Sequence, residues 1–571
     1  MRWACVLLLL FPVVLTLFSC SESKKSHADL VLVNGQMWTV NPKQPWASAV
    51  AIEKNTIIAL GSQKDIEPYI LEKTEVVDLK GAFVLPGFID CHTHFLEGGF
   101  SLDSIELKEA GSKEAFIRRI KEKADAIKEG EWILNGNWDH QQFESPLLPR
   151  KEWIDPVTRN NPVCVNRHDG HMVLLNSLAL KMCGISNATS DPPGGEIVRD
   201  PQNGEPTGIL IDAAIRLAEK HIPAPSFEEK VNACRAALEH ARACGVTSVH
   251  DMAYSSHFEV YQKLLEQDEL TACVRVYVQI PQVDDIDLKE FKQWESNSLL
   301  VFGGLKGFVD GSLGSSSALF FDPYTENPDR SGLLHAHMFP EGIMKERLLK
   351  AEKLRLQVAV HAIGDKANHM ILDIFQEIFD FSEARDRRWR IEHAQHLIAE
   401  DIGRFGQLGI IASVQPFHAI DDGRWAEKMI GEERILFAYP FLSLAEKGAL
   451  LAFGSDWTVA PLDPIQGIYA AVTRRTLDGQ NPEGWIPGEK ISLVDAIKGY
   501  TINAAYSEFS EQLKGSLEIG KKADLVVLDR NLFEIPPEEI SRARVQMTVF
   551  DGRIIFQKGR KKSRDSEESN S

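Results

Sequence analysis

The sequence predicts an α/β fold: a (β/α)8 barrel of the TIM type that carries an inserted subdomain, and a small β-sandwich domain built from both terminal segments. Two observations lead to this prediction. In the middle of the chain, short apolar runs alternate with helical stretches, as in parallel β/α units. Near each end, short β-patterned runs are divided by Asn-Gly and Lys-Asn turn signals, as in hairpins. We place the sandwich at residues 29–84 and 510–559, and the barrel at residues 85–509.

Eight apolar runs are the candidate barrel strands, which is the number that closes a TIM barrel. They are VLPGFIDCHTH from Val84, VTSVHD from Val246, VRVYVQI from Val274, GLKGFVD from Gly304, QVAVHA from Gln357, WRIEHA from Trp389, IIASVQ from Ile410 and LLAFGSD from Leu450. The gap between the first and second runs is about 150 residues, far longer than one crossover helix requires. We therefore expect an inserted subdomain at about 95–215, where a long insertion at the catalytic face shapes binding.

The composition of the chain excludes several classes of protein. Of its 571 residues, 44% are hydrophobic and 25% are charged, as in an ordinary globular protein. Disordered, collagen-like and coiled-coil classes are therefore excluded. The formal net charge of −19 leaves no broad basic field, so we expect no nucleic-acid partner.

The first residues have the pattern of an export signal. Residues 1–19 contain one early Arg, an apolar run and then small polar residues, which predicts a cleaved signal peptide. The following Leu17-Phe18-Ser19-Cys20 resembles a bacterial lipobox, which implies lipidation of Cys20 and an anchored linker at 20–28. We expect an exported protein held at the periplasmic face by its lipid alone, with Ser21 favouring an outer membrane; the alternative is a secreted protein with an unmodified Cys20. Residues 560–571 are expected to form a disordered tail.

The predicted strand ends carry residues that bind metals, and a barrel builds its active site at those ends. His92 and His94 flank Thr93, so the period of two in a strand directs both imidazoles to one side. Four other runs contribute Lys306, His361, His393 and Asp456. Each residue alone is a weak signal, because a lone His at a strand end is usually a hydrogen-bonded core residue. Their occurrence together in strand order predicts a metal site, although a cationic Lys among metal ligands is unexpected.

This order of residues resembles the amidohydrolase superfamily of metal-dependent hydrolases over nearly the whole mature chain. The segments that carry the resemblance are PGFIDCHTH, GLKGFVDGSLG, VHAIGDKAN, RIEHAQ, SVQPFHA, FGSDWTVAPLDP and the closing KGSLEIGKKADLVVLD. Within the insertion, PVCVNRHDGHMVLLNSLAL and GGEIVRDPQNGEPTG are similar to the branch (amidohydrolase 3) that includes N-substituted formamide deformylase.

The resemblance implies a role for each of these residues. His92, His94 and Asp456 would hold one metal ion, and His361 and His393 a second, with Lys306 carboxylated by CO2 into a bridging ligand. These donors suit Zn²⁺, and Fe, Mn or Ni are compatible. The metals would lower the pKa of a bound water and polarise the substrate carbonyl. Asp456 would take a proton from this water as it attacks and return the proton to the leaving nitrogen. If Lys306 remains an amine, the site holds one metal.

Other residues are candidates for substrate binding, each with a structural alternative. Asp169 and His171 belong to a polar cluster in the insertion, which could instead be a surface loop. Trp138 matches the same branch and is expected in the pocket wall, although Trp is more often a core residue. Gln415 ends the seventh run, where it would face the pocket mouth or fix neighbouring loops. Asp310 lies four residues after Lys306 and on the same side of the strand, where it would contact substrate or support Lys306.

The function these features predict is hydrolysis of a non-peptide carbon–nitrogen bond, with a small linear N-acyl or N-formyl amide as substrate. A second enzyme hypothesis keeps the metal site but cleaves an ester, lactone or cyclic amide, because the same hydroxide attacks any of these carbonyls. A third is a lipid-anchored binding protein without turnover. Barrel enzymes of this kind often dimerise, so a homodimer is a candidate assembly.

Overall fold

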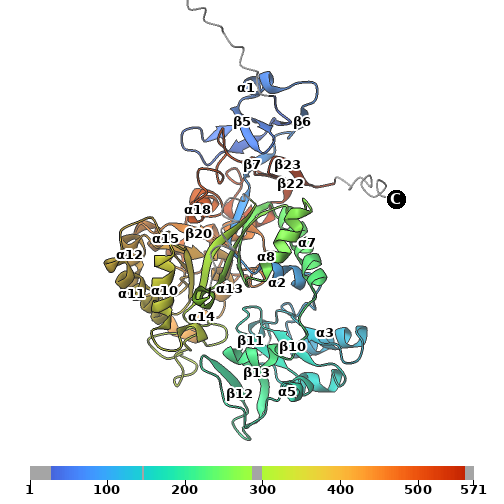
Figure 1. Cartoon of the computed structure of the whole chain (residues 1–571), viewed down its shortest axis with the longest axis vertical. Helices are drawn as coiled ribbons and strands as arrows, with labels where there is room; N and C mark the ends of the chain where they lie inside the picture. The colour runs from blue at the N-terminus through green and yellow to red at the C-terminus, as the bar shows by residue number, and fades with distance from the viewer. Residues whose placement is uncertain (1–26, 144–146, 286–298, 560–571) are drawn as a thin grey trace, which may run out of the picture.

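The computed structural model describes residues 27–143, 147–285 and 299–559. The predicted signal peptide, the lipidation site Cys20 and the predicted tail lie outside these residues. None of the helices in the described ranges has both the length and the apolar character that a membrane crossing requires. Figure 1 shows the chain as three parts, with a β-sandwich at the top of the view, a barrel in the centre and an inserted subdomain at the bottom.

The central part is the predicted barrel. Within the described residues, eight strands lie side by side in chain order, and all seven of their pairings are parallel. The strands are β8 (Phe88–Thr93), β14 (Val246–Ala253), β15 (Cys273–Gln279), β16 (Leu300–Phe308), β17 (Val358–Ala362), β18 (Arg390–His393), β19 (Ile411–Val414) and β20 (Leu451–Phe453). A parallel bridge between Thr93 and Trp457 joins the first strand to the segment that follows the last. The barrel is therefore nearly closed, and the predicted fold class is confirmed.

Helices cover the outside of the barrel (Figure 1). The longer ones are α7 (Phe227–Ala243), α8 (His257–Glu266), α10 (Ile343–Lys353), α11 (Asp365–Phe381), α12 (Ala399–Leu408), α14 (Ala426–Ile435) and α16 (Pro464–Thr473); shorter ones are α2 (Phe95–Ser101), α6 (Arg216–Glu219), α13 (Pro416–Asp422), α15 (Phe441–Glu446), α17 (Leu493–Gly499) and α18 (Ile502–Ser507). The start of α7 shows why the sequence forms a helix there. Ser226 and Glu229 make a capping box, in which each side chain accepts a hydrogen bond from the other residue's backbone N–H.

Strands from both ends of the chain form the β-sandwich. One sheet has the order β5-β4-β1-β6 and the other β23-β22-β21-β7-β2-β3 within the described residues. Their bounds are β1 (Leu30–Val33), β2 (Gln36–Trp38), β3 (Trp46–Ala47), β4 (Ala49–Glu53), β5 (Thr56–Gly61), β6 (Glu75–Asp78), β7 (Phe83–Pro86), β21 (Leu525–Leu528), β22 (Val545–Phe550) and β23 (Arg553–Gln557), with α1 (Gln63–Ile66) beside them. Apolar side chains of both sheets, among them Leu32, Val50, Val84, Leu525 and Val549, make one core.

The first predicted barrel run is in fact two strands. β7 belongs to the sandwich and β8 to the barrel, and Gly87 lies between them. A Cβ at Gly87 would lie 2.4 Å from Oγ1 of Thr247, so only glycine allows this close approach. The chain therefore passes directly from the sandwich into the first barrel strand.

The insertion forms its own sheet below the barrel in the view of Figure 1. In the described residues its strand order is β12-β13-β11-β10-β9. The elements are α3 (Lys113–Ala126), β9 (Ile133–Leu134), α4 (Lys151–Ile154), β10 (Val163–Asn166), β11 (Met172–Leu175), α5 (Ser177–Met182), β12 (Gly195–Arg199) and β13 (Pro206–Asp212). The helix at the expected start of the insertion, α2, instead packs against α7 of the barrel, where a Cβ at Gly99 would lie 2.0 Å from the carbonyl oxygen of Ala233.

Candidate active site

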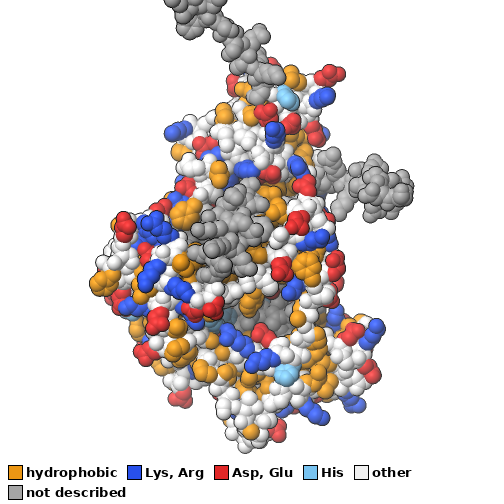
Figure 2. Space-filling view, in the orientation of Figure 1, with side chains coloured by type: hydrophobic (Ala, Val, Ile, Leu, Met, Phe, Trp, Pro, Cys, Tyr) orange, Lys and Arg blue, Asp and Glu red, His pale blue; other side chains and the backbone are white. Residues whose placement is uncertain are grey.

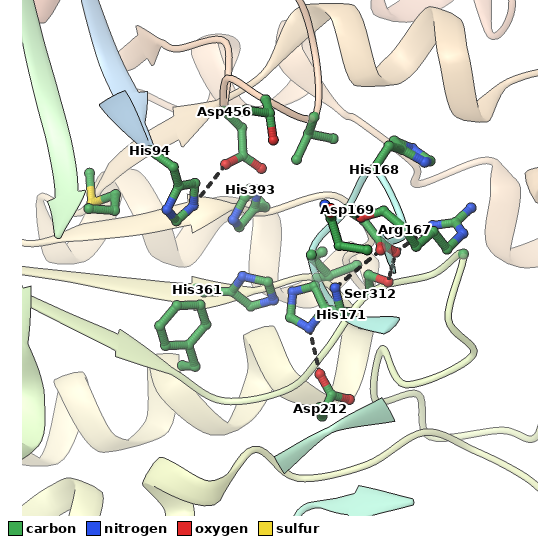
Figure 3. Close-up of a pocket in the computed structure, with 18 of the residues that line it drawn as sticks. His94, Arg167, His168, Asp169, His171, Asp212, Ser312, His361, His393 and Asp456 are labelled. Atoms are coloured by element: carbon green, nitrogen blue, oxygen red, sulfur yellow. Dashed lines mark hydrogen bonds and ion pairs between the residues drawn. The ribbon is translucent and has the colours of Figure 1, made fainter. Parts of the chain in front are cut away.

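A cavity of about 400 Å³ lies where the carboxyl ends of the barrel strands meet the insertion. Its lining includes all six predicted metal-ligand residues: His92, His94, Lys306, His361, His393 and Asp456. Asp169 and His171 of the insertion line it as well (Figure 3). Charged side chains of both signs surround a hollow on the face of the molecule seen in Figure 2, between the barrel and the insertion.

Five of the six residues are connected by short distances. Oδ1 of Asp456 lies 3.4 Å from Nε2 of His92 and 3.3 Å from Nε2 of His94. Nζ of Lys306 lies 3.2 Å from Nε2 of His92. One ligand atom each from His92, His393 and Asp456 lie within 4.8 Å of one another, which is a suitable spacing for a single metal ion.

His361 is the sixth residue and lies at the edge of this group. Its ring centroid is 4.4 Å from that of His393. Its Nε2 lies 3.0 Å from the carbonyl oxygen of Gly311 and 3.5 Å from Oδ1 of Asp310. The ring is therefore close enough to share the site, but its Nε2 faces the loop after β16.

Two of the site residues depend on an unusual backbone conformation. His393 has φ of +74° and Asp456 has φ of +57°, in the left-handed region that non-glycine residues rarely adopt. Glu392 points into the barrel and contacts His92, so strand alternation alone would turn His393 outward. The left-handed turn at the end of β18 brings His393 into the cavity instead, and strain of this kind is typical of functional sites.

The donor set fits a divalent metal ion. Within the described residues, Oδ1 of Asp456 and Nδ1 of His393 are buried and have no hydrogen-bond partner. Buried polar atoms without a partner are costly, and a coordinated cation would satisfy them. Imidazole nitrogens and a carboxylate oxygen are the ligands that Zn²⁺ prefers.

The electrostatics of the group depend on its burial. Burial lowers the pKa of Lys306 to about 8. Burial also lowers the pKa of His92 to about 4, and the charge of Lys306 adds to this effect. Burial raises the pKa of Asp456, but the neighbouring His92 and His94 lower it by more. The pKa of Asp456 therefore lies well below its ordinary value. At neutral pH the site therefore holds an ionised carboxylate beside a neutral His92.

His171 enters the cavity from the insertion and is held by Asp212. Nδ1 of His171 lies 2.6 Å from Oδ1 of Asp212, and its ring centroid is 5.3 Å from that of His361 (Figure 3). Burial lowers the pKa of His171, but Asp212 raises it more, and the pKa is about 9. The insertion thus places a positively charged imidazole beside the metal-ligand group.

Asp169 also lines the cavity, but its carboxylate is occupied by protein donors. Oδ1 accepts from the backbone N–H of His171 at 3.2 Å. Oδ2 accepts from Arg167, from Ser312 and, at 3.1 Å, from Ser315. Asp169 therefore connects the insertion to the loop that follows β16, the strand of Lys306.

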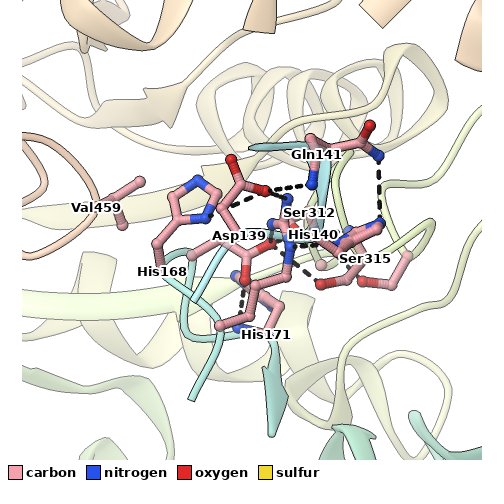
Figure 4. A network of polar contacts seen from close by, with 12 residues as sticks. Asp139, His140, Gln141, His168, His171, Ser312, Ser315 and Val459 are labelled. Carbon is pink, nitrogen blue, oxygen red and sulfur yellow. Dashed lines mark hydrogen bonds and ion pairs between the residues drawn. The ribbon is translucent and has the colours of Figure 1, made fainter. Parts of the chain in front are cut away.

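A wider polar network surrounds this connection (Figure 4). Arg167 is fully buried and also pairs with Asp139, at 3.1 Å from Nη2 to Oδ1. From another part of the insertion, Nζ of Lys108 donates to the carbonyl oxygen of Val459 at 2.7 Å, three residues after Asp456. The insertion is therefore fixed to two barrel loops, the one that follows β16 and the one that carries Asp456.

Three predicted substrate-binding residues have other positions. The described residues that line the cavity do not include Trp138, Asp310 or Gln415. Trp138 lies in the core of the insertion, where its indole N–H donates to the carbonyl oxygen of Val165 at 2.8 Å. Asp310 is buried behind the site and accepts the backbone N–H groups of Leu319, Ile363 and Gly364. Gln415 is 1% exposed, and its Nε2 lies 3.4 Å from the carbonyl oxygen of Ser413. The structure thus places Trp138 and Gln415 away from the cavity lining, and Asp310 meets the site only through His361.

Comparison with known proteins now identifies the family. The model of the amidohydrolase family matches residues 75–556. The chain belongs to the amidohydrolase family. This amidohydrolase is 40% identical over 556 residues to Protein LONG AFTER FAR-RED 3 of Arabidopsis thaliana, over 95% of this chain and 94% of the relative. It is 26% identical over 546 residues to N-substituted formamide deformylase of Arthrobacter pascens, over 93% of this chain and 98% of the relative.

A solved structure gives the same result. An uncharacterized metal-dependent hydrolase from Pyrococcus horikoshii OT3 superposes with a TM-score of 0.71 at 29% identity, covering 89% of this chain and 99% of that one. The resemblance to the amidohydrolase superfamily is thereby confirmed. The amidohydrolase described here is a metal-dependent hydrolase that acts on carbon–nitrogen bonds.

The sequence reasoning missed two residues that contact the site. Asp212 holds His171, and Glu392 accepts a hydrogen bond from His92. The sequence did contain a signal for Glu392. Arg390 and Glu392 are two residues apart in one strand, so their side chains must point to the same side of the barrel wall. Asp212 had no comparable signal, since it meets His171 only through the pairing of β11 with β13.

Proposed function

We propose that this amidohydrolase hydrolyses a linear N-acyl or N-formyl amide of a small molecule and releases an amine and a carboxylic acid. The observation that carries the proposal is the position of Asp456, whose buried Oδ1 lies 3.3 Å from His94 and 3.4 Å from His92. No described residue donates a hydrogen bond to this oxygen. A carboxylate placed in this way can hold a divalent ion and exchange a proton with water. The similarity to N-substituted formamide deformylase supports a linear amide as substrate.

The metal-ligand residues have separate proposed roles. His92, His94 and Asp456 would hold one ion, His361 and His393 a second, and carboxylated Lys306 would bridge the two; without carboxylation the site would hold one ion. Bound ions supply Lewis acidity, which lowers the pKa of water and polarises a carbonyl. Zn²⁺ suits the donors, and Fe, Mn or Ni are chemically compatible.

Protein groups account for proton movement and substrate orientation. Asp456 takes a proton from the attacking water and returns it to the amide nitrogen, so that the nitrogen leaves as a neutral amine. His171, which Asp212 holds at the cavity wall, donates a hydrogen bond to the substrate. Asp169 does not bind the substrate directly, because both of its carboxylate oxygens already accept hydrogen bonds from other residues. Its role is to hold the insertion in place beside the cavity.

The size of the cavity limits the substrate. About 400 Å³ accommodates a small molecule, and the insertion and barrel loops enclose it from both sides. A cavity of this size supports a small amide as the substrate.

The test combines metal analysis with a substrate panel. Purified protein is assayed for bound metal and for hydrolysis of N-formyl and N-acyl amines, N-acyl amino acids, cyclic amides, lactones and esters. We expect bound metal and the highest kcat/KM on a linear amide. The Asp456→Asn variant should lose at least about 1,000-fold in kcat, whereas Asp191→Asn on the insertion surface should retain wild-type activity.

Each other outcome has a definite meaning. Preferred turnover of a lactone, ester or cyclic amide would replace the linear amide with that substrate class. Bound metal without turnover of any panel member would favour a binding protein. An active Asp456→Asn variant would overturn the proton-transfer role of Asp456.

For cellular location, we propose export and lipidation at Cys20, which the lipobox-like Leu17-Phe18-Ser19-Cys20 supports. The full-length protein, expressed in a bacterium with labelled fatty acid, should incorporate the label and sediment with membranes. The Cys20→Ser variant should do neither. Incorporation of label by Cys20→Ser would contradict the proposal.

A further inference from the structure

Below the metal-ligand group, the interior of the barrel contains charged residues instead of the usual branched apolar layer. His250, Arg390, Glu392 and Glu508 are each 0% exposed. None of them lines the cavity within the described residues, and none takes part in the reaction proposed above. A buried group of charges is costly unless its members pair, so its arrangement requires a reason.

Glu392 is the member that touches a metal-ligand residue. Its Oε2 lies 2.5 Å from Nδ1 of His92 and accepts from Oγ of Ser413 at 2.7 Å. Its Oε1 accepts from Nε of Arg390 at 2.7 Å. Both oxygens thus face donors, so Glu392 serves as an acceptor for His92.

Arg390 fixes the position of Glu392. Its Nη2 donates to the carbonyl oxygen of Cys91 at 2.8 Å, on the same strand as His92. Its Nη1 lies 2.7 Å from Nδ1 of His250, whose Nε2 lies 3.0 Å from Oε2 of Glu508. Glu508 in turn pairs with Lys514 at 2.7 Å. The contacts form one continuous chain from His92 to the lower end of the barrel.

The hydrogen bond determines which nitrogen of His92 faces the metal-ligand group. An acceptor at Nδ1 places the proton there, which leaves the lone pair on Nε2. Nε2 is the atom that lies 3.4 Å from Asp456 and 3.2 Å from Lys306. Carboxylate partners of this kind orient metal-binding histidines and raise their basicity.

We propose that Glu392 is a positioning residue of the metal centre, which holds His92 with Nε2 directed at the ion and is itself held by Arg390 and Ser413. This inference rests on the proposed metal-binding role of His92. It assigns the contacts of Glu392 with Arg390 and Ser413, at the upper end of this charged interior, to metal retention. Glu392 touches neither the substrate nor the reacting atoms.

The test compares variants at the two ends of the chain of contacts. Glu392→Gln keeps the shape of the side chain but removes the charged acceptor beside His92. Glu508→Gln makes the same chemical change at the other end, where it touches no metal-ligand residue. Zinc retained by each purified protein is measured after dialysis against chelator buffers of graded free zinc, together with thermal unfolding and the visible spectrum of the cobalt-substituted protein.

We expect Glu392→Gln to bind zinc roughly 10- to 100-fold more weakly and to change the cobalt spectrum. Glu508→Gln should lower the unfolding temperature but change zinc affinity by less than about two-fold. Glu392→Asp, which keeps the charge but withdraws it from His92, should show intermediate affinity. If Glu392→Gln does not fold, Ser413→Ala, which removes one donor to the same oxygen, should still weaken zinc binding several-fold.

The outcomes separate this inference from the proposed function. Equal zinc affinity in wild type and Glu392→Gln, or equal losses in Glu392→Gln and Glu508→Gln, would overturn the positioning role and leave the proposed hydrolysis intact. If Glu392→Gln does not fold, unchanged zinc affinity in Ser413→Ala would overturn it in the same way. Wild-type protein that retains no metal would overturn both.

Discussion

Asp212 and His171 are joined by a 2.6 Å contact between Oδ1 and Nδ1; Asp212 is the last residue of β13, and His171 immediately precedes β11. Asp212 has φ of +48°, a conformation that costs energy in a non-glycine residue. The fold of the insertion therefore maintains a strained backbone at Asp212, and this places the Asp212 carboxylate where it fixes the imidazole of His171 at the cavity wall.

If His171 binds substrate, the Asp212→Asn variant should lower kcat/KM about 10- to 100-fold, because the ring loses its charged partner and its fixed orientation. Bound metal should be unchanged, since neither residue belongs to the proposed ligand set. Steady-state kinetics and metal analysis check this. Wild-type kcat/KM in Asp212→Asn would exclude the role of His171.

Carboxylation of Lys306 should depend on its buried environment. Only the neutral amine attacks CO2, and a pKa of about 8 makes roughly a tenth of the Lys306 side chains neutral at pH 7. We expect protein purified without CO2 to regain activity on addition of bicarbonate, and ¹³C-labelled bicarbonate to give a carbamate NMR signal that Lys306→Ala lacks. Full activity in the absence of CO2, with no such signal, would show that Lys306 remains an amine.

Removal of metal should lower stability as well as activity. A ligand that binds only the folded state adds about 2.7 kcal/mol at 100 times its Kd. Chelated protein should therefore unfold at a lower temperature and regain both properties on addition of Zn²⁺. Calorimetry and activity assays check this, and identical unfolding temperatures with and without metal would contradict it.

Arg167 should be important for the attachment of the insertion. It is 1% exposed and pairs with Asp139 and Asp169, so Arg167→Met leaves two carboxylates without their partner. We expect a loss of about 3–5 kcal/mol in unfolding free energy and faster proteolysis of the insertion. Arg118→Met, which removes an exposed helix pair with Glu122, should change stability by less than about 0.5 kcal/mol. Equal effects of the two substitutions would contradict the prediction.

The pH dependence of stability should include a contribution from Asp524 in the sandwich. Burial raises its pKa to about 6, above the value of about 4 for the unfolded chain. Between these values the folded state binds more protons, so stability falls as pH rises from about 4 to 6 and stays lowered above that range. Asp524→Asn should therefore be more stable than wild type by about 1–3 kcal/mol at pH 7.5 and equal to it at pH 4. A gain at pH 4 equal to that at pH 7.5 would contradict this origin.

The sequence predicted the parts of the structure that depend on regular patterns. The eight strand runs were correct, and the six candidate ligands meet in one cavity because barrel geometry brings the carboxyl ends of the strands together. His393 reaches this cavity only through the left-handed turn at the end of β18. Asp310 was placed wrongly because the same alternation was extended past Phe308, where β16 ends. Trp138 was placed wrongly because the insertion has a core of its own, which takes up large apolar side chains.

Contacts between distant segments had no signal in the sequence. The hydrogen bond from Ser312 to Asp169 depends on how the insertion packs against the barrel. Neither the strand period nor the spacing of motifs in the sequence encodes that packing. The same is true of the pairing of Asp212 with His171. Glu392 differs from these, because it lies two residues from Arg390 in one strand, and that spacing alone directs both side chains to the same side of the barrel wall.

The direct passage from β7 into β8 has a consequence for how the protein is made. β7 pairs with β21, where Val84 lies opposite Val527, about 440 residues later in the chain. At 5–20 residues per second, a ribosome needs roughly 20–90 seconds to synthesise the segment between them. Throughout that interval the strand that carries His92 is tethered to an unfinished sheet. The metal-ligand group should therefore be among the last parts of a newly made molecule to take its final form.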